Sequence, residues 1–183
     1  MPIYMIHADI TKLSVDAIVD PTDCWYSGSG GADLVIHELA GPGLYEELLS
    51  FPALEMGQAV ITSGYNLPAK YIIHTFGPIW EGGQKNEAKL LADCYRNSLK
   101  LAKQYGCQSI AFPIISGGSF GFPNDDALVI AKETIDEFLQ GDDLAVYIVA
   151  YRSHTFNLGA KLFADVSKEI RKRSVHRIRF IPN

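Results

Sequence analysis

The fold is decided by residues 17–40, which read AIVDPTDCWYSGSGGADLVIHELA. The apolar run at 17–19 predicts a buried strand, and residues 31–40 have the apolar spacing of a helix. Between them, glycines let the loop backbone approach a ligand closely. Because the loop runs into a helix, its free N–H groups and the positive end of the helix dipole favour an anion, above all a phosphate. The spacing matches neither the G-x-G-x-x-G dinucleotide fingerprint nor a P-loop.

Strands and helices alternate along the whole chain. Such alternation predicts a three-layer α/β/α sandwich around a central mixed, mostly parallel sheet, with ligands at the carboxyl ends of the strands. No linker or repeat is visible, so we expect a single domain over residues 1–183, ending in a basic tail at 172–183 that is solvated or contacts a partner or polyanion. Strands are expected at 3–6, 17–19, 59–62, 71–76, 109–113 and 144–151, and helices at 31–40, 43–50, 86–105, 125–139 and 155–172.

Composition narrows the class of protein. A hydrophobic fraction of 48% suffices for a packed core. The formal net charge of -5 argues against a sequence-independent nucleic-acid binder, although backbone N–H groups can still bind an anion. The N-terminus shows no secretory signal, and no apolar run approaches the roughly 20 residues of a membrane helix. The three cysteines are widely spaced and form no C-x-x-C pair. We therefore expect a cytoplasmic protein with reduced thiols and no membrane or nucleic-acid partner.

Four segments follow predicted strands and should gather at one rim of the sheet. Asp9, after the first strand, can accept a hydrogen bond from an exocyclic amine, although an Asp before Thr is more often a cap or an Asx-turn. The loops at 28–32 and 115–123 offer two sets of backbone donors, which suit a diphosphate better than a single phosphate. Tyr151, at the end of the last strand, can stack on a base or simply pack at the rim.

Taken together, these segments resemble the macro domain family. The family's G-D-I-T motif appears as ADIT at 8–11, and its N-A-A-N segment, glycine loop and D-x-x-I-H align without a gap onto residues 20–37. The G-Y-N-L-P-A-K-Y-I-I-H-T segment is present at 64–75, and the I-S-T-G-x-x-G-x-P loop appears at 115–123. The resemblance spans about residues 3–151 and implies the macro domain fold with a pocket for ADP-ribose.

The resemblance also implies a role for each matching position. Asp9 and the backbone of Ile10 would face adenine, beside Tyr151 as a candidate stacking residue. Phe122 would pack on the distal ribose, although an aromatic side chain beside a proline is often only local packing. Asp33 would position or activate the water that attacks the anomeric carbon. The diphosphate would lie between two loops formed by Gly28, Ser29, Gly30, Gly31, Ala32, Ser116, Gly117, Gly118, Ser119 and Phe120.

The chain departs from the family at both ends of N-A-A-N, where it carries Asp20 and Asp23. Asp23 is expected beside Asp33 at the catalytic end, but an ionised carboxylate can only accept hydrogen bonds. Its charge would oppose the diphosphate by about 2–3 kcal/mol. Three compensations are open: a raised pKa of Asp23, a carboxylate that points away from the pocket, or Mg²⁺ held by Asp20, Asp23 and Asp33. No metal or other cofactor is assigned, because a solvated or capping Asp20 is favoured.

Three histidines lie near these segments. His37, on the helix after the glycine loop, is interpreted as structural rather than as a general base. His7 and His74 fall in predicted strands and are expected to be satisfied core or rim histidines. None of the three is assigned to catalysis.

Three functions therefore remain open. The first is hydrolysis of ADP-ribosyl bonds, in mono-ADP-ribosylated proteins or in O-acetyl-ADP-ribose, which Asp33 supports and Asp23 opposes. The second is a non-catalytic reader of ADP-ribose or of an ADP-ribosylated protein. The third is a divergent member that binds another nucleotide or a phosphate ester, with or without a metal. Motif spacing alone does not decide between them.

Overall fold

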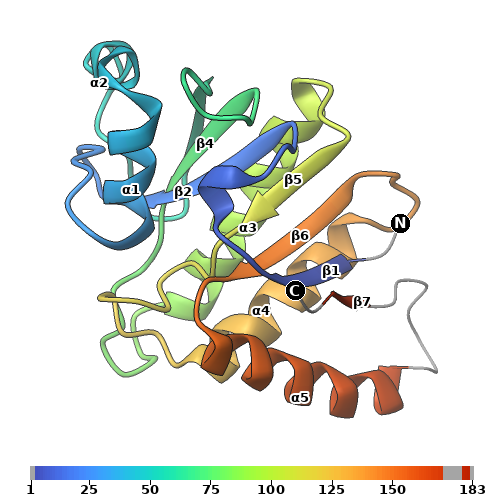
Figure 1. Cartoon of the computed structure of the whole chain (residues 1–183). Helices are drawn as coiled ribbons and strands as arrows, with labels where there is room; N and C mark the ends of the chain where they lie inside the picture. Colours follow the sequence, from blue (N-terminus) through green and yellow to red (C-terminus); the bar gives the residue numbers. More distant parts are fainter. Residues whose placement is uncertain (1–2, 171–178, 182–183) are drawn as a thin grey trace.

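A seven-stranded sheet of order β3-β4-β2-β5-β6-β1-β7 forms the centre of the molecule (Figure 1). The computed structural model describes residues 3–170 and 179–181, with the side chains of 3–161 and 181. Within these residues β3 runs antiparallel to β4, and the other neighbouring strands pair in parallel. The strands are β1 (Ile3–His7), β2 (Ala17–Thr22), β3 (Ala59–Ser63), β4 (Tyr71–Phe76), β5 (Ser109–Phe112), β6 (Ala145–Ala150) and β7 (Arg179–Ile181).

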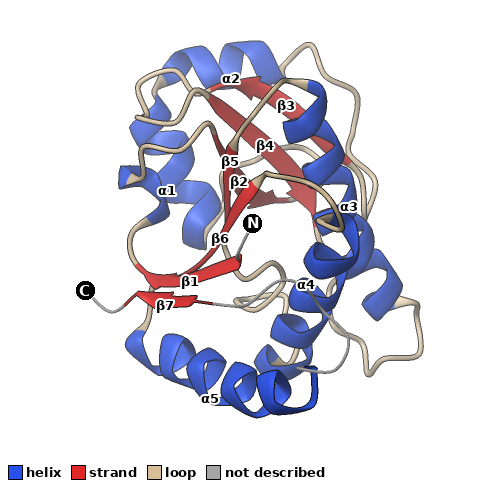
Figure 2. Ribbon diagram, turned by 90° about the vertical axis from the view of Figure 1, so that its right-hand side faces the viewer, coloured by secondary structure: helices blue, strands red, loops and turns tan. Residues whose placement is uncertain are grey.

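Helices cover both faces of this sheet, as Figure 2 shows. Two of them pack on one face and three on the other, so the predicted three-layer α/β/α sandwich with a mixed, mostly parallel sheet is confirmed. In the part of the chain that is described, none of the helices has the length and apolar character to cross a membrane. The first face carries α1 (Gly31–Ala40) and α2 (Pro42–Leu48), and the second carries α3 (Glu87–Gln104), α4 (Asn124–Phe138) and α5 (Ser153–Ile170).

The continuous apolar runs of the central strands follow from burial on both faces. In β2, Ala17 and Val19 belong to the core beneath α3 and α4, whereas Ile18 belongs to the core beneath α1 and α2. The same alternation holds in β5, where Phe112 and Ala111 point to opposite faces. A parallel strand covered on both sides therefore lacks the polar alternation of a half-exposed strand.

Two strands differ from the sequence prediction by more than one residue at an end. β2 continues to Thr22, whereas the apolar run predicts an end at Val19. Pro21 is tolerated because β5 pairs only with the first two residues of β2, so at Pro21 the strand has β4 alone as a neighbour. Part of the basic tail, Arg179–Ile181, forms β7 beside β1, and the other tail residues from 171 on lie outside the described residues.

The carboxyl ends of β1, β5 and β6 meet at one rim of the sheet. Ala8 follows β1, Pro113 follows β5 and Ala150 ends β6, and all three line the same cavity. The parallel topology thus gathers segments that are far apart in the sequence, as the strand pattern predicts.

Candidate functional site

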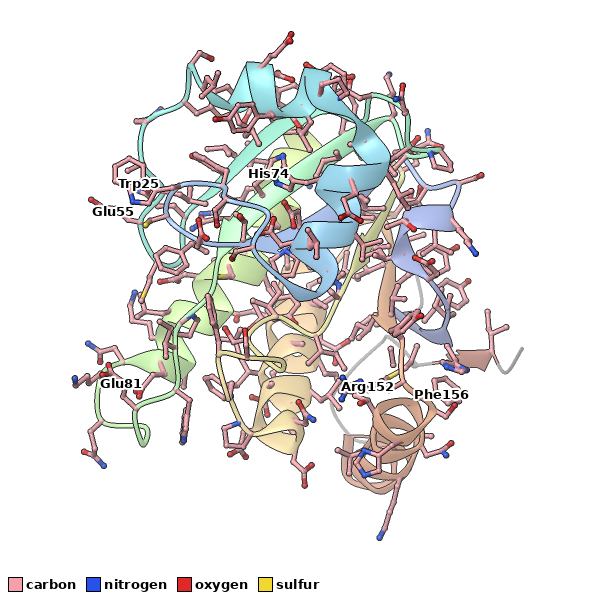
Figure 3. All side chains as sticks on the ribbon, turned by 60° about the vertical axis from the view of Figure 1, so that its left-hand side comes forward. Trp25, Glu55, His74, Glu81, Arg152 and Phe156 are labelled. Atoms are coloured by element: carbon pink, nitrogen blue, oxygen red, sulfur yellow. The ribbon has the colours of Figure 1, made fainter. Side chains whose placement is uncertain are left out.

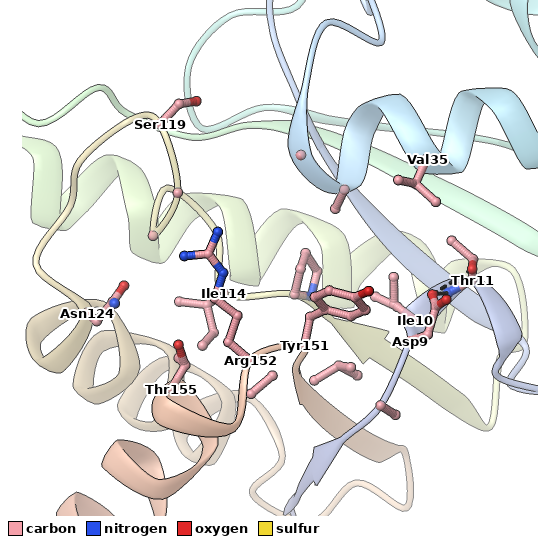
Figure 4. A pocket seen from close by; sticks show the side chains of 18 residues that line it. Asp9, Ile10, Thr11, Val35, Ile114, Ser119, Asn124, Tyr151, Arg152 and Thr155 are labelled. Carbon is pink, nitrogen blue, oxygen red and sulfur yellow. Dashed lines mark hydrogen bonds between the residues drawn. The ribbon is translucent and has the colours of Figure 1, made fainter.

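A cavity of about 730 Å³ opens at this rim. Its walls come from the ends of β1 and β6, the loop after β5, and the first residues of α1, α4 and α5. Figure 4 shows Asp9 and Thr11 at one end and Asn124 and Ser119 toward the other, with Tyr151 between them. The volume falls within the range of small-molecule binding sites.

Three helices begin at the cavity wall. Gly31 and Ala32 start α1, Asn124 starts α4, and Thr155 lies in the first turn of α5. Each helix start presents backbone N–H groups without partners inside the helix and the positive end of its dipole. Arg152, just before α5, adds a guanidinium to the same wall. The cavity therefore favours an anionic ligand although the chain carries a net charge of -5.

The loop after β5 is strained at Ser116 and closely packed at Gly117. Ser116 has φ +61, in the left-handed region where a non-glycine residue is strained by about 1–3 kcal/mol. Close packing holds it there, since a Cβ on Gly77 would collide with the Ser116 hydroxyl. A Cβ on Gly117 would lie 2.8 Å from Oδ1 of Asn124. Glycine at 117 thus lets the loop, which lines the cavity, approach the start of α4.

Asp9 serves both as a cap and as part of the cavity wall. Its Oδ1 accepts hydrogen bonds from the backbone N–H of Thr11 at 3.0 Å and from the Thr11 hydroxyl at 2.6 Å. These bonds cap the short 3-10 helix η1 (Ile10–Lys12). Among the described residues, nothing donates to Oδ2, which leaves this oxygen available to a ligand amine.

Tyr151 extends over the cavity from the end of β6. Its side chain is 76% exposed, and its backbone oxygen accepts a 3.0 Å hydrogen bond from Nε2 of His7. His7 is thus a satisfied rim histidine, as predicted. The Tyr151 ring presents an uncovered face on which a flat base can stack.

Other predicted ligand contacts lie outside the cavity wall. Phe122 is buried in the core and packs on Trp80, with ring centroids 4.8 Å apart, so local packing fits its position better than contact with a ribose. Phe120 packs edge-on against Phe76. The predicted residues that line the cavity are Asp9, Ile10, Gly31, Ala32, Gly117, Gly118, Ser119 and Tyr151, whereas Gly28, Ser29, Gly30, Ser116, Phe120 and Phe122 do not.

The carboxylate of Asp23 turns into its own loop. It accepts from the backbone N–H groups of Trp25 at 2.9 Å and Ser27 at 3.1 Å, and also from the Ser27 hydroxyl. Burial acts to raise the pKa of Asp23, but these hydrogen bonds outweigh it and lower the pKa. A raised pKa of Asp23 is one of the three ways in which its charge could be compensated, and this prediction is wrong. The negative charge is instead held by donors of the loop.

Asp20 is fully buried beneath α1, so the expectation of a solvated or capping residue is wrong. Its Oδ2 lies 2.8 Å from Nδ1 of the buried His74 and 3.5 Å from Nε2 of His37 (Figure 3 labels His74). Burial alone would raise the pKa of Asp20, but the two histidines lower it to about 2. His74 is a satisfied core histidine, as expected, because its Nε2 also lies 3.0 Å from the Thr62 hydroxyl.

Asp33 lies next to the cavity but faces inward. Its Oδ2 accepts a 3.1 Å hydrogen bond from the Thr22 hydroxyl, and its Oδ1 lies 3.2 Å from Nε2 of His37. Burial, supported by the nearby Asp20 charge, raises the pKa of Asp33 to about 6 against the opposing pull of His37. A carboxylate of this pKa can accept a proton near neutral pH.

His37 holds the two buried carboxylates together. Burial would lower its pKa, but its contacts with Asp20 and Asp33 raise the pKa to about 10. A histidine that stays protonated at neutral pH has no free nitrogen to act as a general base. The interpretation of His37 as structural agrees with this geometry.

Sequence reasoning missed several residues of the wall. Arg152 immediately follows Tyr151, and Asn124 and Thr155 stand at the starts of helices. The rule that ligand residues follow parallel strands would have included Arg152 if applied one residue further. The Mg²⁺ set of Asp20, Asp23 and Asp33 is not brought together, since within the described residues Asp20 groups with His37 and His74.

The sequence and the fold are similar to those of macro domains. A family model for the Macro domain matches residues 19–131. A macro domain-containing protein of Methanosarcina mazei is 50% identical over 151 residues, which cover 81% of this chain and 81% of the relative. An O-acetyl-ADP-ribose deacetylase of Citrobacter rodentium is 46% identical over 169 residues, 89% of this chain and 96% of the relative. The Oceanobacillus iheyensis macrodomain with ADP has a TM-score of 0.83 and 37% identity, with 89% of this chain and 90% of that chain covered.

Proposed function

The chain belongs to the macro domain family, and we propose that it binds ADP-ribose in the 730 Å³ cavity. The convergence of the starts of α1, α4 and α5 on this cavity carries the proposal. Helix starts and glycine loops supply N–H donors for a diphosphate without any net positive charge on the protein. The similar Oceanobacillus iheyensis macrodomain is seen with ADP, which contains the same adenosine and diphosphate groups.

The wall residues suggest how the ligand lies. Oδ2 of Asp9 would accept a hydrogen bond from the adenine amine, and Tyr151 would stack on the base. The diphosphate would lie between the start of α1 at Gly31 and the loop at 117–119. The distal ribose would then extend toward Asp33, the residue after the wall residue Ala32.

We further propose that the protein hydrolyses an ester on this distal ribose. The Citrobacter rodentium relative, an O-acetyl-ADP-ribose deacetylase, supports this substrate class. Asp33, whose pKa is raised to about 6 mainly by burial, would take a proton from the attacking water. Ester cleavage would release the acid and leave ADP-ribose in the cavity.

A non-catalytic reader is the second candidate function. It is favoured by the position of Asp33, which is not part of the cavity wall and already contacts Thr22 and His37. A reader needs only the adenine and diphosphate sites, and a protein carrying ADP-ribose could then be its partner.

Calorimetric titration with ADP-ribose, ADP and adenosine tests the ligand. We expect ADP-ribose and ADP to bind with micromolar affinity and adenosine to bind far more weakly, because the helix starts act on the diphosphate. Equal binding of adenosine would contradict the proposed diphosphate site. Absence of binding to all three would favour another nucleotide or phosphate ester.

Turnover of O-acetyl-ADP-ribose and of a mono-ADP-ribosylated protein then separates hydrolase from reader. For a hydrolase, Asp33→Asn should lose turnover yet still bind ADP-ribose, whereas the control Asp125→Asn, at an exposed position of α4, should match the wild type. Tight binding without turnover by the wild type would establish the reader. Turnover undiminished in Asp33→Asn would exclude Asp33 as the base.

A further inference from the structure

Behind α1 lies a group of four side chains that we call the Asp20 cluster: Asp20, Asp33, His37 and His74. One ligand atom from each of Asp20, His37 and His74 lies within 4.8 Å of the others. Asp33 joins them through Oδ1, which is 3.2 Å from Nε2 of His37. None of the four lines the cavity proposed for ADP-ribose, although Asp33 follows the wall residue Ala32.

His74 has a polar partner at each ring nitrogen. The Thr62 hydroxyl lies 3.0 Å from Nε2 and 3.1 Å from the backbone oxygen of Ser63, and its single hydrogen can be donated to either. In the tautomer that donates from Nε2–H to this hydroxyl, Nδ1 presents a lone pair to Oδ2 of Asp20 at 2.8 Å. In that tautomer Nδ1 and Oδ2 can together bind a metal ion.

Several buried atoms of the cluster also lack a hydrogen-bond partner. Among the described residues these include Oδ1 of Asp20 and Oδ1 of Asp33, on side chains that are 0% and 4% exposed. Nε2 of His37 is within ion-pair distance of both carboxylates but is aligned for a hydrogen bond with neither. Buried polar atoms are normally satisfied, so this set lacks a group that would complete it.

Three of the four side chains hold their donor atoms close enough together for one small ion. The distances are 2.8 Å from Oδ2 of Asp20 to Nδ1 of His74 and 3.5 Å from the same oxygen to Nε2 of His37. Ligands about 2.0–2.2 Å from a tetrahedral ion are about 3.3–3.6 Å apart. Asp33 does not belong to the group of donor atoms that all lie within 4.8 Å of one another, so it stands beside the three ligands and not among them.

The chemistry of the donors selects the class of ion. Two imidazole nitrogens with a carboxylate suit zinc and neighbouring transition metals, whereas Mg²⁺ prefers oxygen ligands and water. When both imidazoles are neutral, the carboxylates of Asp20 and of the adjacent Asp33 carry two negative charges, which one divalent ion neutralises. Such a set avoids the large cost of an uncompensated buried charge.

His37 connects the buried cluster with the surface. His37 lines a shallow groove of about 380 Å³ between α1 and α2, together with Glu38, Gly41, Pro42 and Tyr45. The carboxylate of Glu38 places a negative charge in this groove, which favours the approach of a cation. A metal site needs such an entry path.

We propose that Asp20, His37 and His74 form a binding site for one divalent transition-metal ion of the zinc class, with the carboxylate of Asp33 beside it. The ion replaces the protons that otherwise lie between the two histidines and the Asp20 carboxylate. Binding should therefore release up to two protons for each ion. The three ligands lie outside the wall of the proposed ADP-ribose cavity, and Asp33 lies between the two proposed sites.

The test is calorimetric titration of the chelator-treated full chain with Zn²⁺, repeated in buffers of different ionisation enthalpy to count released protons. Co²⁺ serves as the spectroscopic probe, because a tetrahedral site gives intense visible absorption. We expect one ion per chain. Asp20→Asn and His37→Gln should each weaken binding at least tenfold, and thermal melts will show that both variants are folded. His154→Ala, at an exposed histidine on α5, and Cys24→Ser, at a free thiol, should bind Zn²⁺ like the wild type.

Failure of the wild type to bind one Zn²⁺ in a saturable manner would overturn the proposal. So would Zn²⁺ binding that is unchanged in both folded variants, or lost equally in His154→Ala or Cys24→Ser. ADP-ribose titrations on the same samples keep the two proposals apart. Zn²⁺ binding without ADP-ribose binding supports the metal site and contradicts the proposed ligand. ADP-ribose binding without Zn²⁺ binding supports the proposed ligand and contradicts the metal site.

Discussion

The hydroxyl of Thr22 donates a 3.1 Å hydrogen bond to Oδ2 of Asp33. Thr22 ends β2 and Asp33 lies in the first turn of α1, so this bond joins the two ends of the glycine-rich segment. Both side chains are buried. A donor to a carboxylate favours its ionised form, whereas burial raises the pKa of Asp33 to about 6. His37 opposes this rise in the pKa of Asp33, and we expect the Thr22 donor to act in the same direction as His37.

Removal of this donor in Thr22→Val should raise the pKa of Asp33 further. If Asp33 is the base, the acid limb of the pH–rate profile for O-acetyl-ADP-ribose should move up by about one pH unit, since a hydrogen bond to a charged group contributes about 1.5–3 kcal/mol. Thr75→Val is the matched control, because it loses a buried hydroxyl bonded to the Gln58 oxygen at 2.7 Å. A limb that stays in place in Thr22→Val would mean that Asp33 does not govern the rate.

The ion pairs of His37 should make stability depend on alkaline pH. Burial would lower its pKa, but Asp20 and Asp33 raise the pKa from 6.5 to about 10. Because the folded pKa exceeds the unfolded one, this stabilisation is complete below pH 6.5 and is lost as pH rises through 10. Urea unfolding with a chelator present should show the free energy of unfolding falling across this range.

His37→Gln should flatten that decline, because the variant has no titrating group at this position. His154→Gln, at an exposed site, should keep the wild-type slope. If the wild type and His37→Gln show parallel curves between pH 6.5 and 10, the ion pairs of His37 do not contribute to stability.

Gly28 and Gly30 should differ sharply in their tolerance of alanine. Gly28 has φ +63, and a Cβ there would lie 3.0 Å from Cγ of His37. Gly30 has extended backbone with φ 174, and a Cβ there meets nothing within 4 Å. Gly28→Ala should therefore lower the free energy of unfolding by about 1–3 kcal/mol, with Gly30→Ala near the wild type. Urea titration measures both, and equal losses would show that crowding at His37 is unimportant.

Arg152 should strengthen binding of the diphosphate and not of the base. An exposed charge pair contributes up to about 1 kcal/mol, so Arg152→Ala should weaken ADP-ribose binding about threefold to fivefold, and less at high salt. Lys161→Ala is the control, because Lys161 is exposed on α5 outside the cavity wall. Calorimetry should show the same adenosine affinity for both variants. An equal loss for adenosine would place Arg152 at the base instead.

How much of the fold and of the site the sequence predicts depends on how far apart the interacting residues are along the chain. The strand at 71–76 and the gathering of Asp9, Gly31 and Tyr151 at one rim follow from local patterns and parallel topology. The burial of Asp20 does not, because its neighbours resemble a turn and its partner His74 is 54 residues away. The sequence does not predict β7, because this strand has only three residues and follows a basic segment.

Asp9 provides the sharpest test of the adenine site, because its two oxygens have separate roles. Oδ1 caps η1 through Thr11, and Oδ2 is proposed to accept from the adenine amine. Asp9→Asn keeps an oxygen for the cap but presents an amide donor to that amine, so affinity for ADP should fall about tenfold to a hundredfold. Inosine diphosphate carries a carbonyl in place of the amine, and the variant should bind it better than the wild type does.

Stability separates this effect from damage to the fold. Asp9→Asn should unfold at the wild-type urea concentration, whereas Asp9→Ala, which loses the cap, should lose about 1 kcal/mol. Calorimetry with the adenosine and inosine diphosphates on both variants completes the comparison. If Asp9→Asn keeps the wild-type preference for ADP, the base is recognised by other residues, and Asp9 acts only as the cap of η1.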